Sequence, residues 1–85
     1  MYGVIWRKTA MDALTDAFAT ADTTRRKMIE RAVIFFNAEL AGDPRNLGES
    51  RSGNRRIAFD MQCAITFAVD EPIAGVVRVS HFWTF

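Results

Sequence analysis

The spacing of the apolar residues changes along the chain, and this change limits the fold more than any other feature of the sequence. Up to Leu40 the apolar residues recur at helical spacing. From Ile57 onward they alternate with other residues, as in strands with one buried face. Gly42-Asp43-Pro44 separates the two regions, because glycine favours a helix C-terminal turn and proline cannot continue a helix. The sequence therefore predicts an α+β domain.

The first region predicts a strand over Tyr2–Arg7, followed by two helices. Thr9 resembles an N-cap with Asp12 as the acidic residue that often follows it. The first helix has one apolar stripe, formed by Ala10, Leu14, Phe18 and Ala21. Asp22 or Thr23 is predicted to cap the second helix. Its stripe consists of Ile29, Val33, Phe36 and Leu40.

The second region predicts three strands joined by short turns, which implies an antiparallel meander. The first alternates Ile57, Phe59 and Met61 with Arg56, Ala58 and Asp60, and a tight turn follows near residues 60–62. The second presents Cys63, Ile65, Phe67 and Val69 at alternate positions. Asp70-Glu71-Pro72 opens another turn before a last strand over Val76–Phe82. The predicted order is β-α-α-β-β-β, with a helical hairpin packed on one face of a mainly antiparallel sheet.

The composition limits the classes of function. A chain of 85 residues is one domain, residues 1–85, and buries only a modest core, so a partner or self-association is expected to add stability. The formal net charge of +1 is too small to indicate a nucleic-acid binder by itself, so an anionic partner must meet a local patch. No apolar stretch is long enough for a signal peptide or a membrane span, and we expect a cytoplasmic protein with no membrane partner.

Few residues are of the types that hold metals or cofactors. A single cysteine, Cys63, excludes an intramolecular disulfide, and its apolar surroundings favour a small buried side chain over a nucleophile. One histidine and one cysteine do not make a structural zinc site. The chain has no glycine-rich phosphate loop and no serine nucleophile motif. We expect no metal and no cofactor.

The segment from Gly48 to Ile57 carries three arginines within six positions: Arg51, Arg55 and Arg56. Arginine binds phosphate or carboxylate in a bidentate manner, and a loop that leads into a strand would hold such groups at the edge of the sheet. Two interpretations remain open. The arginines bind a phosphate or acidic residues of a partner, or they form a solvated loop in which Glu49 pairs with one of them.

His81 is the one side chain able to exchange protons near neutral pH without strong perturbation. Strand alternation places it on the face of Val77 and Val79, which favours a position at the margin of the core. Arg78 falls on the opposite face, with Ser80 and Phe82, where it could join Arg56 in a basic patch. The aromatic tail that follows consists of Phe82, Trp83 and Phe85, which favours packing or a protein interface over base stacking.

Several motifs together resemble one family. A strand ending in Trp6 and a helical hairpin lead to Asp43-Pro44, then to residues 47–51 and to Gly53-Asn54-Arg55-Arg56-Ile57, and the strands at 65–69 and 76–79 follow. This order resembles the RelE/ParE superfamily of bacterial type II toxins, also called plasmid-stabilisation proteins, over nearly the whole chain. The resemblance implies the toxin of a toxin-antitoxin system, which inhibits growth. It further implies that an antitoxin encoded beside it wraps the hairpin and the sheet.

The resemblance implies two alternative mechanisms. RelE-like toxins enter the ribosomal A site and cut mRNA, as endoribonucleases called mRNA interferases; ParE-like toxins inhibit DNA gyrase without cleavage. Arg55 or Arg56 matches the arginine at the start of the first meander strand. His81-Phe82 lies where some RelE-like toxins have histidine-tyrosine, so that phenylalanine replaces the tyrosine hydroxyl. The strand around Cys63 has no basic residue where several of the nucleases place an arginine.

Three functional hypotheses follow. In the first, Arg51, Arg55 and Arg56 bind phosphate with help from Arg78, and His81 acts as general acid or base on ribosome-bound mRNA. In the second, the chain inhibits DNA gyrase by binding alone. In the third, it is an interaction protein that keeps the toxin fold and has lost toxicity. A homodimer and a hetero-oligomer with the antitoxin both remain open.

Overall fold

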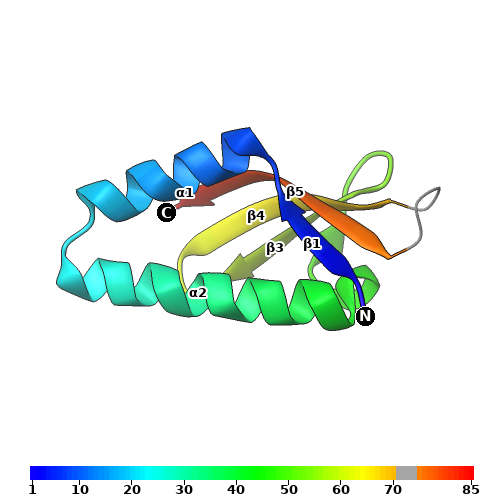
Figure 1. Ribbon diagram of the computed structural model, residues 1–85, viewed down its shortest axis with the longest axis horizontal. Coiled ribbons are helices and arrows are strands. Elements are labelled where there is room, and N and C mark those ends of the chain that lie inside the picture. Colours follow the sequence, from blue (N-terminus) through cyan, green and yellow to red (C-terminus); the bar gives the residue numbers. More distant parts are fainter. Residues whose placement is uncertain (71–74) are drawn as a thin grey trace.

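The computed structural model describes residues 1–70 and 75–85. In chain order it contains β1 (Gly3–Trp6), α1 (Lys8–Thr20), α2 (Thr23–Gly42), a 3₁₀ turn η1 (Pro44–Asn46), β2 (Glu49–Ser50), β3 (Arg55–Asp60), β4 (Cys63–Asp70) and β5 (Val76–Thr84). The strands form one sheet in the order β1-β5-β4-β3-β2, and α1 and α2 run back and forth along it (Figure 1). The predicted α+β fold is confirmed, and β2 is an additional short strand.

One apolar core joins the two helices to a single face of the sheet. Its fully buried large side chains include Phe36 and Leu40 from α2, Ile65 and Phe67 from β4, and Val79 from β5. Both helices therefore cover the same face, as predicted. Within residues 1–70 and 75–85 no helix covers the opposite face of the sheet, and we call it the open face.

The first helix begins differently from the prediction. Arg7 occupies the N-cap position of α1 and makes no side-chain capping bond. The predicted cap at Thr9 is wrong, because α1 begins at Lys8 and Thr9 is already helical. The Thr9 hydroxyl donates to the carbonyl of Ser80 in β5, at 3.0 Å. Lys8 and Asp12 form an ion pair one turn apart, at 2.8 Å. The amino end of α1 is thus fixed to the last strand by a tertiary hydrogen bond.

The second helix agrees with its predicted cap and most of its stripe. The Asp22 carboxylate accepts a hydrogen bond from the backbone N–H of Arg25 at 2.8 Å, as an N-cap does. Ile29, Phe36 and Leu40 are buried as predicted, whereas Val33 is only half-buried and Ala32 is buried in addition. Gly42 is the last helical residue and Asp43 caps the end, so glycine does not supply a left-handed turn there. Pro44 then begins η1.

The meander has the predicted strands and its first predicted turn. Met61 and Gln62 join β3 to β4 with φ values of 53° and 68°, which match the right-handed twist of a two-residue hairpin. Cys63, Ile65, Phe67 and Val69 are all buried, as the alternation predicts. On β3 the core residue is Ala58, so Ile57 and Phe59 lie on the open face. The turn predicted at Asp70-Glu71-Pro72 extends outside the described residues.

A β-bulge in the last strand overturns the predicted position of His81. Thr66 of β4 lies opposite His81, but the next residue, Phe67, lies opposite Val79, so Ser80 is an extra residue. An extra residue shifts the alternation by one position. Val79 and Phe82 are therefore both buried, while His81 is exposed on the open face. The prediction that His81 shares a face with Val77 and Val79 is wrong, as is the placement of Phe82 with Arg78.

Gly48 offers a test of how tightly the segment before β3 is packed. It has a φ of 67°, and a Cβ atom added there would lie 2.0 Å from the Ile57 carbonyl oxygen. Gly53 has a similar φ of 71°, but a Cβ atom added there would have no neighbouring atom within 4 Å. Gly53→Ala is expected to lower the free energy of unfolding by about 1 kcal/mol, the cost of a left-handed backbone. Gly48→Ala is expected to cost at least about 2 kcal/mol more, because the backbone must move. Urea unfolding measures both, and equal losses would contradict the packing described.

Candidate functional site

A pocket of about 470 Å³ lies on the open face, near the end of the sheet where β3 begins. Its charged or titratable lining residues are Arg7, Arg55, Asp70, Arg78 and His81, and Asn54, Ala68 and Ser80 complete it. We call it the basic pocket. Its residues come from the start of α1, from β3 with its preceding loop, from β4 and from β5. Four separate parts of the chain thus converge on one site.

Strand register explains why Arg55 and Arg78 face each other across this pocket. Ala68 of β4 lies opposite Arg55 on one side and opposite Arg78 on the other. Directly opposed residues project from the same face, and two strand spacings separate their backbones by about 10 Å. The side chain of Ala68 is a single methyl group, so the space between the two guanidinium groups stays open. An anion of phosphate size could lie above Ala68 and reach both arginines.

The three arginines of the basic pocket differ in whether they form ion pairs. A carboxylate oxygen of Asp70 accepts a hydrogen bond from Nη1 of Arg78, and the two side chains are 24% and 32% exposed, so water screens this ion pair only in part. Within residues 1–70 and 75–85, the guanidinium groups of Arg7 and Arg55 make no ion pair. The pocket therefore presents two cations that are available to an anionic ligand and a third that is held by a carboxylate.

The ring of His81 is oriented by the bulge residue beside it. The Ser80 hydroxyl donates to the carbonyl of Thr66 at 3.2 Å, and its oxygen lies 3.0 Å from Nδ1 of His81. Because the hydroxyl hydrogen is used on Thr66, the Ser80 oxygen acts as acceptor for an Nδ1–H group. This assigns the proton of the neutral ring to Nδ1 and leaves Nε2 with a free lone pair. His81 can therefore accept a proton through Nε2.

The structure separates the predicted arginines into different roles. Arg55 lies beside Arg78 on the open face, in the place that the sequence interpretation gave to Arg56. Arg56 lies opposite the core residue Phe67, and its guanidinium donates to the carbonyls of Leu47 at 2.9 Å and Gly48 at 3.0 Å. It holds the segment before β3 in place.

The third arginine of the predicted cluster lies outside the basic pocket. Arg51 pairs with Glu49 at 3.3 Å, which confirms the predicted pairing of Glu49 with an arginine. Arg55 and Arg56 also line a smaller pocket of about 180 Å³, which shares Asn54 and Arg55 with the basic pocket.

Sequence reasoning missed Arg7, Asp70 and Ser80 as members of the basic pocket. Arg7 reaches it because β1 pairs in parallel with β5 and the Arg7 N–H donates to the carbonyl of Val79 at 2.9 Å. A parallel pairing between the two ends of a chain leaves no local signal in the sequence. Asp70 could have been found, since it lies two positions beyond Ala68 and so shares its face.

An aromatic patch adjoins the basic pocket on the open face. Phe59, Trp83 and Phe85 are 52%, 38% and 61% exposed, and Phe59 meets Phe85 edge to face with ring centroids 5.9 Å apart. They project around Ala64, which is fully buried. Phe82 instead packs in the core, where the centroid of its ring lies 6.2 Å from that of Trp6. The predicted packing role of the aromatic tail thus applies to Phe82, while Trp83 and Phe85 remain accessible.

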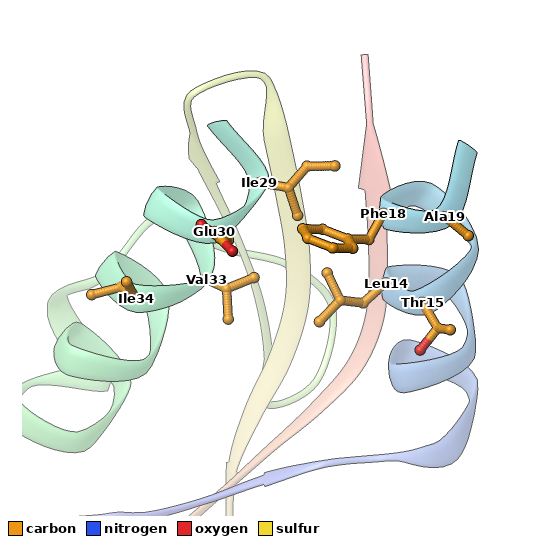
Figure 2. A pocket seen from close by; sticks show the side chains of 8 residues that line it. All are labelled: Leu14, Thr15, Phe18, Ala19, Ile29, Glu30, Val33 and Ile34. Carbon is orange, nitrogen blue, oxygen red and sulfur yellow. The ribbon is translucent and has the colours of Figure 1, made fainter. Parts of the chain in front are cut away.

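A third feature is a groove of about 710 Å³ between the two helices, on the other side of the molecule. Figure 2 shows Leu14 and Phe18 of α1 facing Ile29 and Val33 of α2 across it. Thr15, Ala19, Glu30 and Ile34 form its margins. We call it the interhelical groove. Its lining is mostly apolar, and Ile34 at its edge is 68% exposed.

Cys63 lies in the core, as predicted, and burial raises the pKa of its thiol, so the group stays protonated near neutral pH. Within residues 1–70 and 75–85, no group of three or more histidine, cysteine or carboxylate side chains is placed to hold a metal ion. In the same part of the chain, neither helix is sufficiently long and apolar to span a membrane.

The fold is that of the RelE and ParE toxins. The chain superposes on a chain of the RelBE2 toxin-antitoxin complex of Mycobacterium tuberculosis with a TM-score of 0.77 at 16% identity, covering 99% of this chain and 98% of that one. A chain of the chromosomal ParDE system of Pseudomonas aeruginosa superposes with a TM-score of 0.72 at 11% identity, covering 99% of this chain and 96% of that one. The isolated RelE toxin of Escherichia coli superposes with a TM-score of 0.68 at 14% identity, covering 99% of this chain and 84% of that one. No family model matches the sequence, and no curated protein matches it.

The different roles of the two adjacent arginines can be tested with the same substitution at each. Arg56→Gln is expected to lower the free energy of unfolding by about 1–3 kcal/mol, because charged hydrogen bonds to two backbone carbonyls are lost. Arg55→Gln is expected to change it by less than about 0.5 kcal/mol, since its side chain makes no such bonds. Urea unfolding measures both variants. A larger loss for Arg55→Gln would reverse the assignment.

Proposed function

We propose that the chain is the toxin of a bacterial type II toxin-antitoxin system, and that its basic pocket cleaves mRNA on the ribosome. The observation that carries this proposal is the Ser80 bulge, which brings His81 onto the open face beside Arg55 and Arg78. A group that accepts a proton next to cations that bind phosphate is what RNA cleavage requires. The fold shared with RelE and ParE toxins supports the toxin class.

The proposed reaction is an attack of a ribose 2′-hydroxyl on the adjacent phosphorus. Arg55 and Arg7 bind the phosphate above Ala68 and stabilise the charge that develops on its oxygens. Nε2 of His81 accepts the proton of the attacking 2′-hydroxyl. The bond from phosphorus to the 5′-oxygen breaks, that oxygen takes a proton from water, and a 2′,3′-cyclic phosphate remains. The hydroxide left by the water takes the proton held by His81, which restores the neutral ring. The RNA chain itself supplies the nucleophile of the reaction.

Cleavage of a defined message on programmed ribosomes tests this reaction. His81→Ala is expected to slow cleavage by about 10²-fold or more, because the proton acceptor is lost. His81 is exposed, so its replacement is expected to leave the free energy of unfolding within about 0.5 kcal/mol of the wild type. Single-turnover rates at saturating protein measure the effect. An uncut message with the wild-type protein would remove the nuclease proposal.

A second candidate function is inhibition of DNA gyrase by binding alone. The exposed aromatic patch favours it, because aromatic residues are enriched where proteins bind proteins. Inhibition of gyrase supercoiling that survives His81→Ala would support this candidate. An unchanged supercoiling rate would exclude gyrase as the target.

The partner within this proposal is an antitoxin, encoded beside the toxin and acting in the same cytoplasm. Two of the three compared structures are toxin-antitoxin systems, which supports such a partner. The interhelical groove is the place where an amphipathic antitoxin helix would bury its apolar face. In this arrangement the antitoxin holds the hairpin and leaves the basic pocket on the opposite face.

Substitution at the margin of the groove tests the site of antitoxin binding. Ile34→Glu is expected to weaken binding of the co-expressed antitoxin by at least about 10-fold, because it places a charge at an apolar contact. Phe85→Glu is the matched control, since it makes the same type of change at an exposed apolar residue of the open face. Isothermal titration measures both affinities. An equal loss for the two variants would exclude the groove as the specific site.

A further inference from the structure

Asp70 is the one carboxylate among the described residues that line the basic pocket. It lies two positions beyond Ala68 on β4 and therefore on the same open face. Arg78 lies directly opposite Ala68, so its side chain reaches Asp70 along the diagonal between the strands. The guanidinium of Arg78 is thereby drawn away from the space above Ala68, where Arg55 projects from the other side.

The position of Arg78 allows two arrangements. It donates to Asp70, as in the structure, or it turns over Ala68 toward an anion that Arg55 also binds. Both side chains of the ion pair are about a quarter to a third exposed, so an incoming anion has access to the pair. Because phosphate and carboxylate both match the fork of a guanidinium, one can replace the other.

We propose that Asp70 is a specificity-determining residue of the basic pocket, which acts by competing with the ligand for Arg78. In the free protein it leaves Arg7 and Arg55 available and withholds the third cation. A lone phosphate gains too little from those two groups to displace the carboxylate, whereas a chain of linked phosphates binds at the available cations first and then recruits Arg78. The pocket consequently prefers polyphosphate and phosphodiester chains to single phosphate groups. This inference deepens the proposed function, because it concerns the same pocket.

The test compares three forms of the full chain: the wild type, Asp70→Asn and Asp16→Asn. Asparagine keeps the shape of the side chain and removes the competing charge. Asp16→Asn makes the same change in net charge on the exposed side of α1, outside the basic pocket. Inorganic phosphate, pyrophosphate and a 12-nucleotide single-stranded RNA with 2′-O-methyl groups, which cannot be cleaved, serve as probes. Isothermal titration gives the affinities.

Asp70→Asn is expected to bind inorganic phosphate about 10- to 100-fold more tightly than the wild type, the range for one added charged hydrogen-bonded contact. The gain should be smaller for pyrophosphate and smallest for the RNA, because these probes already recruit Arg78 in the wild type. Asp16→Asn should leave all three affinities within about 2-fold of the wild type. The double variant Asp70→Asn, Arg78→Gln should lose the gain. A gain that persists without Arg78, or that Asp16→Asn reproduces, would overturn the proposal.

A measurement on the wild-type protein keeps the proposal falsifiable if Asp70→Asn fails to fold. When the RNA saturates the pocket, the side-chain carboxyl ¹³C signal of Asp70 is expected to shift, because Arg78 leaves it. An unshifted Asp70 signal together with a shifted Arg55 Nε signal would overturn the inference. The cleavage assay is independent of these results. Tighter phosphate binding by Asp70→Asn without mRNA cleavage by the wild type would support the inference and reject the nuclease proposal. Cleavage by the wild type without tighter phosphate binding by Asp70→Asn would support the nuclease proposal and reject the inference.

Discussion

The extra residue in β5, Ser80, is the constraint on which the open face depends. Its carbonyl accepts a hydrogen bond from the Thr9 hydroxyl, which fixes the amino end of α1 to the strand. Its own hydroxyl donates to Thr66 and orients the ring of His81. If β5 paired with β4 without the bulge, regular alternation from Val79 would bury His81 and expose Phe82. The bulge at Ser80 therefore places the ring of Phe82 in the core and His81 on the open face.

The two sides of the molecule are suited to different partners. The helical side offers an apolar groove between α1 and α2, whereas the open face combines the basic pocket with the aromatic patch. Arg56 connects the two sides, since it leaves the sheet toward the helices and binds the segment from Leu47 to Gly48. This leaves Arg55, its neighbour, to project from the open face. Adjacent residues of one strand thus point to opposite faces of the sheet, Arg56 to the segment before β3 and Arg55 to the basic pocket.

Local rules predicted those parts of the fold that local interactions decide. The Asp22 cap and the alternation of β4 depend on residues close in sequence, and both were predicted. The bulge at Ser80 was not predicted, because it arises from the pairing of β5 with β4. The types of residue along β5 carry no signal of it. The Thr9 cap was wrong because α1 begins at Lys8, so that Thr9 lies within the helix, where its hydroxyl donates to Ser80, 71 positions away. Of the candidate site, Arg55, Arg78 and His81 were named from sequence, but the faces of the strands that bring them together required the register.

The formal net charge of +1 comes from eleven lysines and arginines against ten aspartates and glutamates, and it bears on recognition. Several arginines are engaged within the protein: Arg26 donates to the carbonyls that end α1, Arg56 to the segment before β3, and Arg78 to Asp70. Long-range attraction to a polyanion is weak for such a chain, because a net charge of +1 produces only a weak field. Under the proposed function, affinity for RNA comes from groups in direct contact, namely Arg7 and Arg55 and, once released, Arg78. The proposed competition by Asp70 would make the pocket select by the spacing of charges on its ligand rather than by their sum.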